Sequence, residues 1–114
     1  MATSKSFETW IAGAFLYSGR ADPTWPVSRG FAKRFENLWS MLPATEKAAP
    51  NPSRLGYRGA FLRVSLHQQW IAFGGVVSLE TPLGIEVRAD PERQFEKDLL
   101  ASAPKGSLPA DLSL

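Results

Sequence analysis

The sequence predicts an α+β protein, a two-layer sandwich in which two helices cover one face of a mainly antiparallel four-stranded sheet. Three observations support this fold class. Apolar side chains recur at helical spacing over residues 28–42, they alternate with polar ones from residue 57 onward, and a chain of 114 residues has the length of one domain. The expected order of elements is β-α-β-β-β-α.

The single α+β domain is expected to span residues 7–101. Residues 1–6 are polar and are predicted to form a disordered N-terminus. Residues 102–114 contain Pro104, Gly106 and Pro109, and we expect a flexible C-terminal tail there.

The first strand is expected within residues 7–17, where aromatic and apolar side chains follow one another without alternation. Such a run is typical of a strand that is covered on both faces. Gly13 interrupts it, which indicates either a bulge or a close approach of another part of the protein to the backbone.

The first helix is expected over residues 28–42. Ser28 is a suitable N-cap, and Pro43 ends the helix because the residue before a proline is pushed out of the helical region. One helical stripe carries the large apolar side chains, namely Phe31, Phe35, Leu38 and Leu42.

Three further strands are expected at residues 57–66, 70–80 and 85–89, with turns at 67–69 and at 81–84. In the first of them, Arg63 and Ser65 lie on the face opposite to the apolar side chains.

The second and third of these strands carry two further expectations. Gly74 and Gly75 interrupt the second strand, and we interpret them as a bulge or a sharp twist within one continuous strand. The last strand is expected to direct two apolar side chains toward the core, Ile85 and Val87.

The second helix follows residue 90. Asp90 is suited to the N-cap and Pro91 to the first helical position. Two apolar side chains are expected to face the core and three acidic ones to form a solvated face: Phe95 and Leu99, against Glu92, Glu96 and Asp98.

Composition excludes several kinds of site. The chain has no cysteine, so it has no disulfide, thiol nucleophile or Cys-based metal centre. The one histidine, His67, lies in a predicted turn without a nucleophile nearby, and we expect neither a metal nor a cofactor. No apolar run reaches the ~20 residues that a membrane helix needs. We therefore expect a soluble, cytoplasmic protein that does not act at a membrane.

The link "YSGRADPTWP", residues 17–26, is unusually rich in side chains that bind proteins. Structurally it is a rigid corner, in which Asp22-Pro23 starts a turn and Trp25 covers the end of the core. Its alternative interpretation is a binding surface, because Tyr, Trp and Arg dominate the energetics of protein interfaces. A second segment of similar composition, residues 53–59, precedes the next strand. If both corners meet at one end of the sheet, the binding residues are Arg20, Asp22, Trp25, Arg54, Tyr57 and Arg58.

The function expected from these residues is that of a small non-catalytic domain that binds another protein as an adaptor, regulator or complex subunit. The oligomeric state stays open. A second hypothesis is a single-stranded nucleic-acid-binding protein, with basic side chains on phosphates and four rings on bases: Tyr57, Phe61, Trp70 and Phe73. A third is a small enzyme or ligand carrier with a carboxylate-based pocket, although the sequence singles out no catalytic residue.

Overall fold

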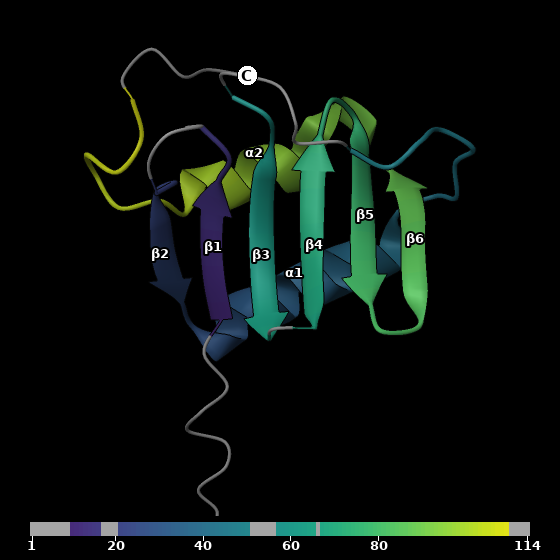
Figure 1. Cartoon of the computed structure of the whole chain (residues 1–114), viewed down its shortest axis with the longest axis horizontal. Helices are drawn as coiled ribbons and strands as arrows, with labels where there is room; N and C mark the ends of the chain where they lie inside the picture. The colour runs from purple at the N-terminus through teal and green to yellow at the C-terminus, as the bar shows by residue number, and fades with distance from the viewer. Residues whose placement is uncertain (1–9, 17–20, 51–56, 66, 110–114) are drawn as a thin grey trace, which may run out of the picture.

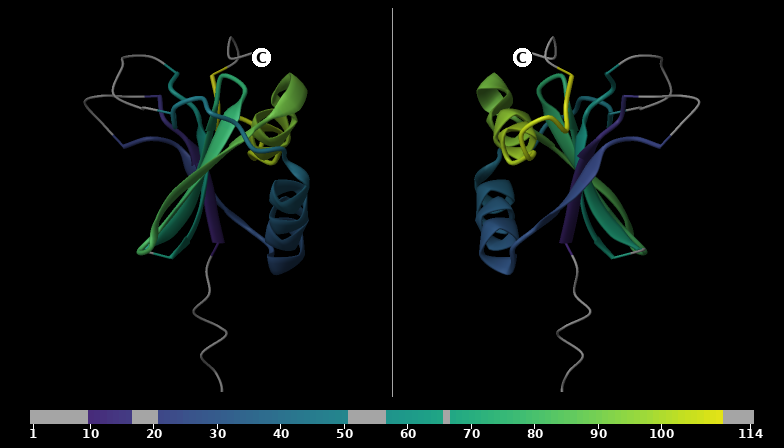
Figure 2. Two further views of the ribbon diagram at one scale, coloured as in Figure 1. Left: turned by 90° about the vertical axis from the view of Figure 1, so that its right-hand side faces the viewer. Right: turned by 90° about the vertical axis from the view of Figure 1, so that its left-hand side faces the viewer.

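The computed structural model describes residues 10–16, 21–50, 57–65 and 67–109. One antiparallel sheet of six strands, in the order β2-β1-β3-β4-β5-β6, forms one layer, and both helices pack on the same side of it (Figures 1 and 2). The opposite side is called the helix-free face below. The α+β class is therefore confirmed, while the sheet has six strands where four were predicted.

The elements of the structure follow one another in a simple order. They are β1 (Trp10–Ala14), β2 (Thr24–Val27), α1 (Arg29–Met41), β3 (Ala60–Ser65), β4 (Gln68–Phe73), β5 (Val76–Thr81), β6 (Gly84–Ala89), a single 3-10 turn (Pro91–Arg93) and α2 (Gln94–Ala101).

The two extra strands have different origins. Gly74 and Gly75 adopt φ angles of +64° and +94°, so they form a two-residue hairpin turn, and the predicted strand 70–80 is two strands. The prediction of a bulge was wrong because two successive left-handed residues reverse the chain. The other extra strand, β2, lies within the predicted corner, and Pro26 is tolerated there because β2 is an edge strand.

The first helix begins and ends where predicted. The Ser28 hydroxyl accepts a hydrogen bond from the backbone N–H of Phe31 at 3.0 Å, and the helix ends at Met41, before Pro43. Its fully buried face is not quite the predicted stripe. Phe31 and Leu38 are only partly buried, and the buried positions are Ala32, Phe35 and Trp39.

The second helix is capped by Asp90, whose carboxylate accepts hydrogen bonds from the backbone N–H groups of Phe95 (2.8 Å) and Glu96 (3.1 Å). The regular helix nevertheless starts only at Gln94, because the preceding turn contains left-handed residues. Glu96 is fully buried, which corrects the prediction that it belongs to a solvated face.

Strand β6 is the other edge of the sheet. The segment that follows α1 closes part of this edge: Ala44 forms a β-bridge with Arg88, and Ala89 donates a backbone hydrogen bond to the Pro43 carbonyl at 2.8 Å. Ile85 is 61% exposed, so its predicted inward orientation was wrong. It lies on the helix-free face, where no helix covers it. Neither described helix has the length and apolar character needed to cross a bilayer.

Candidate functional site

The register of the sheet decides which side chains share the helix-free face. In-register partners of neighbouring strands project to the same side. One such row crosses all six strands and consists of Pro26, Ile11, Arg63, Gln69, Glu80 and Ile85. The next row consists of Thr24, Gly13, Phe61, Ile71, Ser78 and Val87. The helix-free face therefore carries three polar or charged side chains in line, bordered by apolar ones.

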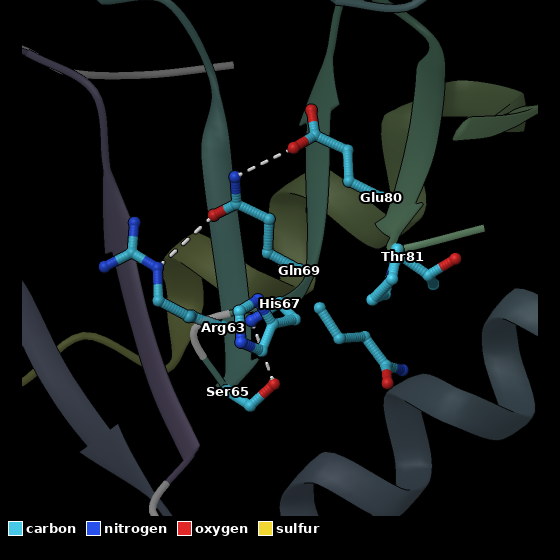
Figure 3. A pocket seen from close by; sticks show the side chains of 8 residues that line it. Arg63, Ser65, His67, Gln69, Glu80 and Thr81 are labelled. Carbon is cyan, nitrogen blue, oxygen red and sulfur yellow. Dashed lines mark hydrogen bonds between the residues drawn. The ribbon is translucent and has the colours of Figure 1, made fainter. Parts of the chain in front are cut away.

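The three side chains at the centre of the first row are joined by hydrogen bonds (Figure 3). The Arg63 Nε–H donates to Gln69 Oε1 at 3.3 Å, and the Gln69 Nε2 amide donates to Glu80 Oε1 at 3.1 Å. Gln69 thus connects a cation to an anion without bringing the two into contact. This Arg63–Gln69–Glu80 row holds the guanidinium in one orientation on the sheet.

Two aromatic rings pack one after the other against the guanidinium of Arg63. The Arg63 Cζ lies 4.7 Å from the centroid of the Phe61 ring, a cation–π arrangement, and Phe15 packs on Phe61 at 4.7 Å between centroids. Phe61 is only 2% exposed even though no helix covers it. Gly13 makes room for the ring, because a Cβ at this position would lie 2.8 Å from Phe61 Cε2. The predicted close approach at Gly13 is confirmed.

A cavity of about 480 Å³ adjoins the row (Figure 3). The chain contributes polar groups to it from β3, β4, β5 and the turns between them. The residues that line it are Arg63, Ser65, His67, Gln68, Gln69, Glu80, Thr81 and Pro82. His67 is exposed in the turn before β4, and its backbone N–H donates to Ser65 Oγ at 3.1 Å.

Two of the predicted binding residues meet at the end of the sheet where β1 ends and β3 begins. Asp22 Oδ1 accepts a hydrogen bond from the backbone N–H of Leu16 at 2.7 Å and lies 3.8 Å from Arg58 Nη2. The Arg58 N–H donates to the Phe15 carbonyl at 2.8 Å, and its guanidinium lies 6.0 Å from the Phe15 ring. The two corners are therefore adjacent, and Phe15 links Arg58 to the stack beneath Arg63.

Trp25 lies in the core on the helix side of the sheet and not on the surface. Its side chain is 2% exposed, and its indole Nε1–H donates to Ser102 Oγ at 2.8 Å. The small Ala12, its partner in β1, leaves space for the indole on this face. Trp25 therefore matches the structural interpretation, in which the indole covers the end of the core. It does not match the alternative interpretation, in which the ring is presented to a partner.

Tyr57 is partly buried and its hydroxyl donates to Glu96 Oε2. Glu96 also accepts from the Gly74 N–H at 3.1 Å and from Arg93 Nε and Nη2 at 3.0 and 2.8 Å. Burial, together with the bond to Glu96, raises the pKa of Tyr57 above its ordinary value. The hydrogen bond to Glu96 likewise raises the pKa of Arg93, and burial raises that of Asp90. Tyr57 thus ties the start of β3 to α2.

The remaining predicted residues, Arg20 and Arg54, lie outside the described residues. Sequence reasoning did not single out Phe15, Gln69 or Glu80 of this candidate site, and it named Phe61 only as a ring for base stacking. The alternation in residues 57–66 already placed Arg63 on the face opposite to the apolar side chains, which was the available signal. What the sequence lacked was the register that aligns Arg63 with Gln69 and Glu80.

Within the described ranges, no group of three or more His, Asp or Glu side chains is placed to hold a metal ion. Comparison of the chain with protein-family models, with curated proteins and with solved structures gave no match.

Proposed function

We propose that the protein is a non-catalytic domain that binds another protein through the helix-free face of its sheet. The observation that carries this proposal is the Arg63–Gln69–Glu80 row, which lies on the side that neither helix covers. Interface surfaces are enriched in arginine and aromatic side chains around a partly apolar centre. The helix-free face offers the guanidinium of Arg63 and the partly exposed Phe73, and the exposed Ile85 adds an apolar side chain at its edge.

A protein partner fits this face better than single-stranded nucleic acid. Base stacking needs open ring faces. Of the four candidate rings, Trp70 packs beneath the helices with Trp39, and Phe61 is covered by Phe15 and Arg63. The hydroxyl of Tyr57 is bonded to Glu96. Phe73 is partly exposed on the helix-free face, and its ring packs against that of Tyr57 at 5.8 Å between centroids.

Site-specific photo-crosslinking tests the proposal. The photoreactive residue p-benzoylphenylalanine is placed at Ile85 on the helix-free face and, as a matched control, at Met41 on α1, which is 73% exposed. Both positions are solvent-accessible, so neither substitution disturbs the core. In extracts of the native host we expect a discrete protein adduct from position 85 and not from position 41, identified by mass spectrometry.

Competition makes the result specific. An excess of unlabelled wild-type protein is expected to remove the adduct, whereas an excess of the Ile85→Glu variant is not, because a charge at this edge opposes apolar contact. Adducts that form only from position 41 would place the interface on the helix side. An adduct that disappears after nuclease treatment would favour nucleic-acid binding in its place.

A further inference from the structure

We infer that Arg63 is a binding residue for a carboxylate, presented by an acidic segment of the protein partner. This inference rests on the proposed function and names the chemistry that the helix-free face recognises. It is carried by the way in which the structure holds one guanidinium and leaves its outer edge unused.

Among the described residues, only one of the five N–H donors of Arg63 has a partner. Its Nε–H bonds to Gln69, and the four N–H groups on the two Nη atoms have no partner in the described part of the chain. The Arg63 Cζ lies 4.7 Å from the centroid of the Phe61 ring, and this contact together with the bond to Gln69 restricts the movement of the guanidinium. A restrained planar guanidinium with free terminal donors matches the two oxygens of a carboxylate, which accepts two parallel hydrogen bonds.

Gln69 is the reason that the charge of Arg63 is available. An acidic residue at this position would pair with the guanidinium and neutralise it. The neutral amide orients Arg63, and the anionic side chain, Glu80, lies one strand farther away on β5. Adjacent strands lie ~4.8 Å apart, and Arg63 and Glu80 are two strands apart, so the amide of Gln69 keeps the carboxylate out of direct contact with the guanidinium. Glu80 therefore directs an acidic group toward the β1 and β3 side of the row.

The same arrangement favours a carboxylate over a phosphate. Phosphate groups are recognised by clusters of arginines, because a doubly charged anion needs several cations. The described part of the row holds one guanidinium with a carboxylate two strands away. Apolar side chains flank the row at Ile11 and Ile85, which suits a protein segment in which an acidic residue is followed by apolar ones.

The test is a titration of the full chain with peptide, monitored by the NMR signals of the arginine Nε–H groups and of the backbone amides. The probe is a capped peptide of six glutamates, and the controls are the capped peptide of six glutamines and inorganic phosphate. We expect shifts centred on Arg63 and Gln69 with hexaglutamate alone. Arg63→Gln should raise the dissociation constant for hexaglutamate roughly tenfold or more, because a charge-assisted hydrogen-bonded pair is lost.

Two further variants separate a specific contact from general attraction. Arg63→Lys keeps the charge but loses the planar pair of donors, so we expect an intermediate affinity. Arg34→Gln removes an exposed cation on α1, 3.8 Å from Asp98, and should leave the affinity unchanged. If Arg34→Gln weakens binding as much as Arg63→Gln, or if Arg63→Gln changes nothing, the inference is wrong.

The remaining outcomes also test the identity of the ligand. Phosphate that binds as tightly as hexaglutamate would overturn the assignment to a carboxylate. A concentration-dependent dimer that Arg63→Gln abolishes, seen by sedimentation velocity, would replace the acidic partner with a second copy of the chain. An adduct from position 85 combined with a negative titration would retain the protein-binding function and reject the carboxylate alone.

Discussion

The two faces of the sheet use a glutamate, an arginine and a third polar side chain in opposite ways. On the helix side, Glu96 is fully buried and accepts hydrogen bonds from Tyr57, Gly74 and Arg93, so its carboxylate is fully used within the fold. On the helix-free face, Glu80 and Arg63 are each partly exposed and are joined only through Gln69. The first network is closed and stabilises the fold, whereas the second ends in guanidinium N–H groups that have no partner among the described residues.

The backbone next to the closed network supports this distinction. Glu92 and Arg93 both have φ angles of +57°, a left-handed conformation that non-glycine residues seldom adopt. This conformation places the Arg93 guanidinium over Glu96, where it forms two hydrogen bonds. Strained residues of this kind persist when their surroundings hold them in place. Here the buried carboxylate supplies that compensation.

The largest expected difference between the faces concerns their apolar side chains. Trp25→Ala should lower the free energy of unfolding by about 3–5 kcal/mol, because it leaves a cavity in the core and removes the bond to Ser102. Ile85→Ala on the helix-free edge should change it by less than about 1 kcal/mol, since the side chain is 61% exposed. Urea unfolding of both variants is monitored by far-UV circular dichroism. For Ile85→Ala, which keeps all tryptophans, it is also monitored by tryptophan fluorescence. Equal decreases in the free energy of unfolding would contradict the assignment of Trp25 to the core and of Ile85 to the surface.

The two glutamates provide the next comparison. Glu96→Gln should cost about 2–4 kcal/mol of stability, because Arg93 and Tyr57 lose their common anionic acceptor inside the protein. Glu80→Gln keeps an acceptor for Gln69 at a partly exposed site and should cost less than about 0.5 kcal/mol. Chemical denaturation of both variants under the same conditions is the measurement. A Glu80→Gln variant that is destabilised as strongly as Glu96→Gln would mean that both networks are structural.

Of the three losses of stability expected within the core and the Glu96 network, the smallest is that of Tyr57→Phe, and it depends on pH. At neutral pH the loss of the hydroxyl bond to Glu96 should cost about 1–2 kcal/mol. The pKa of Tyr57 is raised by folding, so the contribution of this phenol is complete below its unfolded value of 10.0 and is lost as the pH rises through the folded value. The gap in stability between wild type and Tyr57→Phe should therefore narrow above pH 10. Unfolding curves from pH 7 to 11 test this, and a gap that widens would contradict the assigned bond.

The predictable parts of the fold depend on local chemistry. The cap at Ser28 and the proline at 43 set the limits of α1, and alternation identified the strands at 60–65 and 84–89 within a few residues. The hairpin at Gly74-Gly75 was missed because two glycines are compatible with a bulge, and only the φ angles decide between the two. Strand β2 was missed because four residues with a proline carry too short a pattern to be read as a strand.

For the candidate site, composition indicated the types of side chain but not their positions. Composition alone placed arginine and aromatic side chains in the segment before β3. The expected turn at Asp22, with a bond to the backbone two residues on, is not seen, because its carboxylate accepts from the N–H of Leu16. The folded arrangement was needed to show that Trp25 packs under the helices, that Tyr57 is bonded to Glu96, and that Arg63 lies in register with Gln69 and Glu80. The physical reason is that capping, turn chemistry and periodicity act between residues close in sequence, whereas register and burial depend on how strands far apart along the chain align.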